Sequence, residues 1–468
     1  MKVNKLVFIG FGAVGYAVFE IMNKEKIFTE CEVFIIEPRD ITKPHIPDTL
    51  GNKDKAKARA RGDVTDDWKG KIPVKFLQKE ITKENYKSIL GGDVCKCDDK
   101  TMILNLSVDV DSIMLMKYAK DNKCLYIDTS LENYPPTKEA NLEHKLGTTY
   151  EQIKPESLYW RGIEAEKILK GAKTSIITAF GFNPGGVNQY AKKGLKEYAR
   201  LKRPELVSPS VWKGDYKKLA KELELLECQI VELDTQLMKH IYPTDECFVN
   251  TWSCMGFELE ASDNVMLSLN DEDLREYSSL GLIRPDEKKS HIRFLPERGM
   301  NVFRDSKTLD YEGKVVPLKG RLIPHQEIAS LSKFFGDNVS IMYVYDSSKA
   351  SQESLKYFKD NDYRMLKDDY VVWRDDVKPK GHDSIGALLH FKNGDEFWAG
   401  SVCSVEDCKR LGLLSGPTMS QVAGWFVGTM LYISEDPYLG FNYPETLPHK
   451  RIFKFASKYM GREYFKLL

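Results

Sequence analysis

The first half of the sequence alternates short apolar runs with longer mixed segments. The runs are the right length for buried strands, and several of the segments between them have helical periodicity. Strands are predicted at 5–9, 32–36, 73–77, 102–106, 124–128 and 174–179. Strands that alternate with helices are typical of an α/β domain with a doubly wound parallel sheet, the Rossmann arrangement.

The pattern changes after the segment Gly181-Phe-Asn183-Pro-Gly-Gly186. Two stretches rich in β-branched and aromatic residues, 224–259 and 290–345, predict a mixed sheet in a second, α+β domain. Residues 387–402 predict a hairpin that turns at Asn393-Gly394. Helices are predicted at 188–200, 404–412, 418–435 and 449–460. We therefore expect three regions: 1–182, 183–403, and a helical 404–468 that packs back on the first domain.

The first predicted strand runs into Gly10-Phe-Gly12-Ala13-Val14-Gly15 and then into a helical pattern. In this context the glycines predict a dinucleotide-binding turn, since Gly10 permits the turn and Gly12 lets the backbone approach a pyrophosphate. Gly15 allows helix and strand to pack closely, and the N–H groups that open the helix, at Ala13 and Val14, face the phosphates. The alternative is a glycine turn that only packs a helix on a strand.

The second predicted strand ends at Glu37, about 20 residues past the glycines, where an acidic side chain binds ribose hydroxyls and repels a 2′-phosphate. This predicts NAD rather than NADP, although the positive charge of the nearby Arg39 weakens the exclusion of NADP. Ligands of such sheets lie beyond the carboxyl ends of the strands. Polar residues at the ends of later strands are therefore expected to face the nicotinamide half of the cofactor; they are Asn105, Ser107, Asp109 and Thr129.

Composition narrows the function further. The 468 residues include 69 basic and 69 acidic side chains, so no net field attracts nucleic acid or an anionic membrane. The longest apolar candidate, 422–433, is shorter than the roughly 20 residues that cross a bilayer. The sequence starts without a signal peptide, and its nine cysteines form neither a disulfide framework nor a metal site, which predicts a reduced, cytoplasmic protein. The charged stretch 44–71 is interpreted as a solvated loop or as a flap over the cofactor.

Polar groups of unusual kind stand in five further segments. They are Glu132 in IDTSLE, Asn183 in GFNPGGV, Glu232 in VELDTQ, Trp252 and Glu260 in TWSCMGFELE, and His325 with Glu327 in PHQE. Taken singly, each has a structural alternative: a surface carboxylate, a core aromatic residue, a turn or a structural histidine. The HxE of the last segment lacks the Pro-Cys-x-x-Cys of zinc deaminases, so no metal is predicted.

These segments, with GFGAVG and the late WAGSVCS and ISEDPYLG, occur in an order and spacing that resembles bacterial-type homospermidine synthase, a relative of saccharopine dehydrogenase. The resemblance covers nearly the whole chain. It implies a homodimer whose second domain serves substrate binding and dimerisation. It also implies that NAD takes hydride from putrescine, that a second diamine attacks the resulting imine with loss of ammonia, and that the new Schiff base is reduced to homospermidine by the same cofactor.

The resemblance implies a role for each polar group, and the residue types suit a flexible dication that has no carboxylate. Asn183, Glu232, Trp252 and His325 are expected to be catalytic, and Glu132, Glu260, Glu327 and Asp383 to bind the diamine or polyamine. Trp252 offers the best cation–π surface, and Asn183 holds the reacting amine. Amine oxidation needs a neutral nitrogen, so a base is required, for which Glu232 and His325 both remain candidates.

Two other functions stay open from the sequence. One is an NAD(P)-dependent reductase of the saccharopine or carboxynorspermidine dehydrogenase kind, whose carboxylate-bearing substrates require arginines at the site. The other is a non-enzymatic protein that senses a cofactor or kept the fold for structure. The preferred diamine is not fixed by the sequence.

Overall fold

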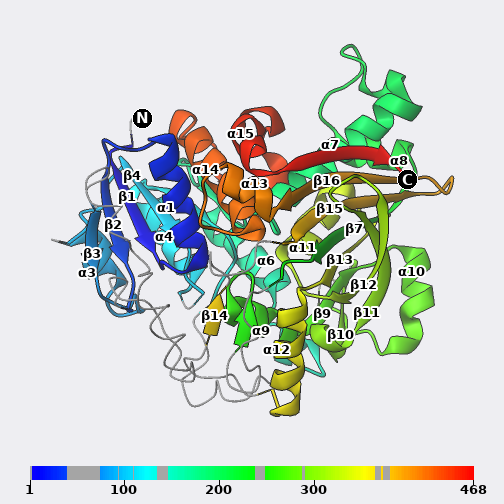
Figure 1. Ribbon diagram of the computed structural model, residues 1–468, viewed down its shortest axis with the longest axis horizontal. Coiled ribbons are helices and arrows are strands. Elements are labelled where there is room, and N and C mark those ends of the chain that lie inside the picture. Colours follow the sequence, from blue (N-terminus) through cyan, green and yellow to red (C-terminus); the bar gives the residue numbers. More distant parts are fainter. Residues whose placement is uncertain are drawn as a thin grey trace.

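A computed structural model describes residues 3–39, 74–92, 94–108, 110–133, 146–237, 248–286, 290–363, 370–372 and 380–468. Within these ranges the chain forms a parallel sheet and a larger mixed sheet, each with helices packed against it (Figure 1). The charged stretch 44–71 and Asp109 lie outside the described residues.

The parallel sheet contains the strands predicted from the first half of the sequence. Its order is β17-β6-β5-β4-β1-β2-β3, with every described pair parallel. The strands are β1 (Lys5–Ile9), β2 (Glu32–Ile36), β3 (Val74–Leu77), β4 (Thr101–Asn105), β5 (Leu125–Asp128), β6 (Ile176–Ile177) and β17 (Phe441–Asn442). The central strands are almost wholly buried because helices cover both faces, which explains their continuous apolar runs. The order reverses between β1 and β4, where ligands bind in this fold.

The mixed sheet follows the path β10-β9-β13-β7-β15-β16-β18, and β12 joins β11 to β13. Its strands are β7 (Leu225–Asp234), β9 (Asn264–Ser268), β10 (Ile292–Arg298), β11 (Phe303–Leu309), β12 (Val315–Leu322), β13 (Ser340–Asp346), β15 (His382–Phe391), β16 (Glu396–Ser404) and β18 (Arg462–Leu467). A separate pair is formed by β8 (Phe248–Asn250) and β14 (Tyr370–Val372). The predicted hairpin is β15 and β16.

Helices cover both sheets. The α-helices are α1 (Ala13–Glu25), α3 (Tyr86–Gly91), α4 (Ser112–Asn122), α5 (Tyr150–Ile153), α6 (Leu158–Leu169), α7 (Gly186–Lys202), α8 (Tyr216–Glu222), α9 (Cys254–Ser262), α10 (Asp271–Glu276), α11 (Gln326–Phe335), α12 (Lys349–Asp360), α13 (Val405–Arg410), α14 (Pro417–Glu435) and α15 (His449–Ala456). Short 3₁₀ turns are η3 (Pro204–Val207), η4 (Tyr277–Leu280), η5 (Gly299–Asn301), η6 (Pro444–Thr446) and η7 (Ser457–Tyr459).

Several elements, β17 among them, differ from the sequence prediction. Helices α9 and α11 interrupt the stretches predicted as sheet, and β18 ends a region predicted as helical. In α9 the Ser253 side chain accepts a hydrogen bond from the Gly256 N–H, which begins a helix within apolar sequence. The last strand pairs with β16, so its conformation is set by an edge more than 50 residues earlier in the chain.

The region after residue 404 contacts both sheets. Helix α14 packs against α1, and Glu20 of α1 accepts hydrogen bonds from the Leu414 and Ser415 N–H groups. Strand β17 extends the parallel sheet while β18 extends the mixed one. In Figure 1, α14 and α15 lie above and between the two sheets. This arrangement joins the sheets through the C-terminal part of the chain as well as through the Gly181–Gly186 segment.

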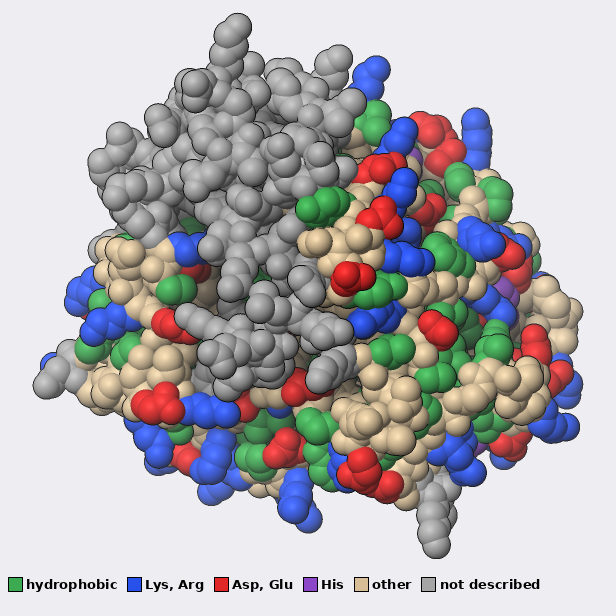
Figure 2. Space-filling model, turned by 90° about the horizontal axis from the view of Figure 1, so that it is seen from below, with side chains coloured by type: hydrophobic (Ala, Val, Ile, Leu, Met, Phe, Trp, Pro, Cys, Tyr) green, Lys and Arg blue, Asp and Glu red, His purple; other side chains and the backbone are tan. Residues whose placement is uncertain are grey.

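The surface carries both charge signs. On the described part of the face in Figure 2, Lys and Arg side chains are interspersed with Asp and Glu side chains. Helices of the described residues are all too short or too polar to cross a membrane.

Candidate active site

The turn after β1 has the geometry that a dinucleotide requires. Gly10 has a φ of +82°, and a Cβ there would lie 2.8 Å from the Leu106 carbonyl oxygen and from the Ser107 backbone. Among the described residues, a Cβ on Gly12 would meet the Arg39 guanidinium alone, at 3.9 Å. Helix α1 has no side-chain cap and no acidic residue in its first turn. These features fit a pyrophosphate on the helix N-terminus, next to Ala13, Val14 and Gly15.

Glu37 stands at the end of β2, beside that turn. Its carboxylate accepts hydrogen bonds from the Phe11 N–H at 2.8 Å and from Arg39 Nε at 2.7 Å. Burial opposes ionisation, but the Arg39 side chain and these N–H donors outweigh it and lower the pKa of Glu37. The group is therefore an anion at neutral pH, as an acid that disfavours a 2′-phosphate should be.

Other predicted residues lie along the carboxyl edge of the parallel sheet. Ser107 packs against Gly10, and Thr129 lies beside Gly181, where a Cβ would be 3.6 Å from its methyl group. The backbone of Glu132 is held by hydrogen bonds from Ser112 and Arg161 to its carbonyl oxygen. Asn105 differs from expectation, because its amide donates to Ser112 and Tyr126 within the domain.

Glu232 is the centre of a buried polar cluster on the mixed sheet. Its Oε2 accepts hydrogen bonds from Tyr343 Oη at 2.6 Å and from Asn183 Nδ2 at 3.1 Å. Glu232 is 4% exposed and Tyr343 3%. Asn183 belongs to the segment that leaves β6, so this hydrogen bond connects the parallel sheet to the mixed sheet.

His325, the residue before α11, extends the cluster. Its Nδ1 lies 3.1 Å from Asn183 Oδ1 and 3.0 Å from both Glu327 oxygens, and its Nε2 lies 3.4 Å from Glu260 Oε2. Burial alone would lower the pKa of His325, but the Glu327 and Glu260 carboxylates raise that pKa well above its ordinary value. The two carboxylates therefore favour the protonated form of His325.

Two more carboxylates share the face of Glu232. Asp234 follows it by two residues on β7, and Asp383 is the register partner of Asp234 on β15. Asp234 accepts hydrogen bonds from Thr251 and Gln236, and Asp383 accepts one from Thr418 through Oδ2. Asp383 Oδ1 is buried and has no hydrogen-bond partner within the part of the chain that the structure describes. Because i and i+2 point to one face of a strand, the alternation in Val-Glu-Leu-Asp would have identified Asp234 from sequence.

Burial shifts the pKa of all three carboxyl groups upwards. The pKa of Glu232 rises to about 7, that of Asp234 to about 6, and that of Asp383 well above its ordinary value. Repulsion among the three adds to burial, while the Tyr343 and Asn183 hydrogen bonds lower the pKa of Glu232. A cation placed among them would relieve both costs.

Trp252 lies at the half-exposed side of the cluster. Its Nε1 donates to Tyr345 Oη at 3.2 Å, and its ring packs against Phe257 with centroids 5.6 Å apart. The contacts thus join Trp252, Tyr345, Tyr343, Glu232, Asn183 and His325 into a continuous set. Tyr343 and Tyr345 were not predicted; their alternation in Tyr-Val-Tyr on a buried strand was the available signal.

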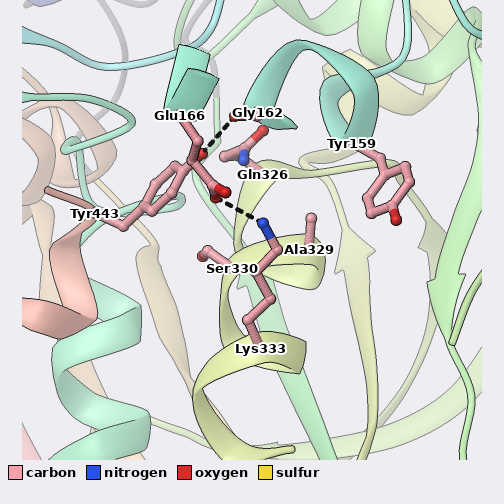
Figure 3. Close-up of a pocket in the computed structure, with 8 residues that line it drawn as sticks. All are labelled: Tyr159, Gly162, Glu166, Gln326, Ala329, Ser330, Lys333 and Tyr443. Carbon is pink, nitrogen blue, oxygen red and sulfur yellow. Dashed lines mark hydrogen bonds and ion pairs between the residues drawn. The ribbon is translucent and has the colours of Figure 1, made fainter. Parts of the chain in front are cut away.

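A small pocket lies next to this set, between α6 and α11 (Figure 3). On one side Tyr443 donates to the Gly162 carbonyl oxygen, and Lys333 pairs with Glu166 at 2.6 Å. Gln326, which follows His325, lines the pocket. Among the described residues no group of His, Cys, Asp and Glu is arranged to hold a metal ion.

Comparison with known proteins also indicates a dinucleotide-binding domain. Residues 6–179 match the model of the saccharopine dehydrogenase NADP binding domain. The chain is 24% identical to homospermidine synthase of Blastochloris viridis over 97% of its length and 89% of the relative, and 23% identical to that of Mesorhizobium japonicum over 97% and 88%. A structure of homospermidine synthase from Legionella pneumophila in complex with NAD superposes with a TM-score of 0.76 at 20% identity, covering 99% of this chain and 91% of that one.

The superposition shows a shared fold across both sheets, which confirms the predicted Rossmann domain with a second mixed-sheet domain. The resemblance noted from the motifs is confirmed as well: in sequence this chain is similar along nearly its whole length to bacterial homospermidine synthases.

Proposed function

We propose that this protein is an NAD-dependent homospermidine synthase, which joins two putrescines, or putrescine and another polyamine, with loss of ammonia. One observation carries the proposal: Asn183, in the segment that follows β6 of the dinucleotide-binding sheet, contacts both Glu232 and His325, and Glu232 shares its strand face with the buried Asp234 and Asp383. Such a site suits an ammonium group, because its carboxyl groups outnumber its imidazole, and His325 already faces the Glu260 and Glu327 carboxylates. When bound, NAD supplies the acceptor of the hydride and later returns it.

Glu232 is the base in this proposal. A group that accepts the proton of a substrate ammonium must be ionised near working pH, and the pKa of about 7 at Glu232 meets that need. The raised pKa of His325 keeps its ring protonated, which suits an acid that gives a proton to departing ammonia. For these reasons the proposal takes Glu232, rather than His325, as the base.

The remaining groups bind and orient. Asn183 fixes Glu232 through its amide N–H and His325 through its carbonyl oxygen. Asp234 and Asp383 attract the inner ammonium, and Glu260 and Glu327 lie towards the outer one, with His325 between them. Trp252 presents its ring to the positive charge that develops as hydride leaves. Thr129 lies beside Gly181, in the segment that leads from the parallel sheet to the mixed sheet, and Glu132 follows it by three residues.

The cofactor is assigned to NAD because Glu37 is an ionised, buried acid at the ribose position. Residues Gly10, Gly12, Ala13, Val14 and Gly15 hold the pyrophosphate, and Ser107 lies next to the turn. Direct titration with NAD and NADP tests this: tight binding of NADP alone would contradict it.

Product analysis tests the reaction. Purified protein, putrescine and substoichiometric NAD should yield homospermidine and ammonia in equal amounts, many turnovers per NAD, without net NADH. A reductase of the saccharopine kind would consume or accumulate NADH instead. Among the described residues no arginine hydrogen-bonds to Glu232, Asp234 or Asp383, which favours the synthase.

A homodimer in the cytoplasm remains our expectation from the family resemblance and the cysteine pattern. Sedimentation velocity of the purified protein measures its oligomeric state, and a monomer at micromolar concentration would contradict the homodimer.

A further inference from the structure

Strand β13 contributes an arrangement that the proposed function does not require. Tyr343 and Tyr345 are two residues apart, so both point to the face that carries Glu232. Their rings are stacked, with centroids 5.7 Å apart and planes 13° apart. Each hydroxyl contacts a different group of the site: Tyr343 donates to Glu232 at 2.6 Å, and Tyr345 accepts from Trp252 Nε1 at 3.2 Å.

We propose that Tyr343 and Tyr345 are a pair of positioning residues, which hold the base Glu232 and the indole of Trp252 in fixed relation to each other. The inference deepens the proposed function and rests on it. The rings are packed between His325, whose ring centroid is 4.6 Å from that of Tyr343, and Phe257, 5.3 Å from that of Tyr345. Both tyrosines are almost fully buried, so neither ring is free to turn.

The Tyr343 hydroxyl also affects the charge of Glu232. Its O–H can donate only to the oxygen it faces, and this stabilises the carboxylate over the acid. Other groups face or adjoin Glu232 from every element packed against it: Asp234 on β7, Asp383 on β15, Tyr345 on β13, Asn183 after β6, and His325 with its partners Glu260 and Glu327. Asn183 and the Tyr343 hydroxyl itself are the neutral groups that donate hydrogen bonds to Glu232.

The pair is tested with phenylalanine variants, because Phe keeps the stacked ring and removes only the hydroxyl. Tyr343→Phe should move the acidic limb of the kcat/KM profile upwards by about one pH unit, since a hydrogen bond to a charged group has that effect. Tyr198→Phe is the matched control: its hydroxyl donates to Asp395 on the distant hairpin, and its profile should stay at the wild-type position. An unmoved limb in Tyr343→Phe overturns this part of the proposal.

Tyr345 is tested through Trp252. Tyr345→Phe should lower kcat about tenfold in the wild-type background and less than twofold in Trp252→Phe, because the hydroxyl acts on the indole alone. Equal losses in both backgrounds would show that Tyr345 does not act through Trp252.

Calorimetric titration of putrescine into the NAD-loaded protein tests the tyrosine pair separately from the proposed reaction. The pH midpoint of binding should rise in Tyr343→Phe and stay constant in Tyr198→Phe. Putrescine binding without homospermidine formation by the wild type would contradict the proposed reaction while still testing the tyrosine pair. A wild-type midpoint in Tyr343→Phe would contradict the pair even in an active enzyme.

Discussion

Glu232 is the residue at which burial, repulsion and hydrogen bonding are most closely balanced. Burial and the Asp234 carboxyl group oppose its ionisation, and Tyr343, Asn183 and His325 favour it. The outcome, a pKa of about 7, places the change of charge within the range where an enzyme works.

Replacing Glu232 by Gln should reduce turnover by about a hundredfold or more, since general-base catalysis contributes at least that much. The amide oxygen can still accept from Tyr343 and Asn183, so the fold is kept. The wild-type kcat/KM should fall as the pH drops through about 7, because the base becomes protonated, and this limb should be absent in the variant. Initial rates from pH 5 to 9 measure it, with Glu222→Gln on the surface of α8 as control; an unchanged limb would move the base role elsewhere.

Trp252 offers a second test at a single side chain. A desolvated cation–π contact is worth about 2 kcal/mol, so Trp252→Ala should lose about thirtyfold in turnover, and Trp252→Phe should lose less. NAD affinity, measured by titration, should be that of the wild type in both variants. Near-normal turnover of the alanine variant would remove the indole from the mechanism.

Among elements, the β1 turn and helix α1 behave as a unit whose two glycines have different tasks. Gly10 has a positive φ and no room for a Cβ, whereas Gly12 has room but faces the expected pyrophosphate.

Gly12→Ala should therefore leave the melting temperature near the wild-type value and weaken NAD binding at least about tenfold, because its methyl group occupies phosphate space. Gly10→Ala should lower both, since its Cβ meets backbone at 2.8 Å. Thermal unfolding and NAD titration of the two variants distinguish these effects. Wild-type NAD affinity in Gly12→Ala would contradict the turn as the phosphate site.

Secondary structure was predicted well where it depends on neighbouring residues in the sequence. Strands β1 to β6 of the parallel sheet, the β15–β16 hairpin and helices α7 and α14 follow directly from periodicity and turn residues, whereas β17 was not predicted. Helix α9 and strand β18 could not be predicted in this way, because the Ser253 cap lies in apolar sequence and β18 depends on pairing with β16. The resemblance pointed to Glu232 and His325, which the structure brings together through Asn183. The period-2 alternation places Asp234 with Glu232, and Tyr343 with Tyr345, on one face of each strand, but only the pairing of β13 with β7 brings the tyrosines to Glu232.

For the whole molecule, the buried carboxyl groups imply that stability depends on pH. A carboxyl whose pKa is raised on folding contributes stability that is full below its ordinary pKa of 4.5 and is lost as the pH rises through about 7. Stability and function are thus opposed at this site.

Glu232→Gln should therefore melt at a higher temperature than the wild type at pH 8, by a few degrees, with a smaller difference at pH 5. Putrescine should raise the melting temperature of NAD-loaded wild type more strongly at pH 8, because the ionised carboxyl groups then receive a dication. Scanning calorimetry at both pH values measures these shifts. A variant that is less stable than the wild type at pH 8 would contradict the assigned burial cost.

The hydrogen bond between Asn183 and Glu232 has a consequence for motion. It joins the segment after β6 to strand β7, so a hinge movement that separated the two sheets would break it and withdraw a donor from the carboxylate. Proton uptake by Glu232 and hinge opening are then linked equilibria: acid favours the open molecule, and a doubly charged alkane draws it shut.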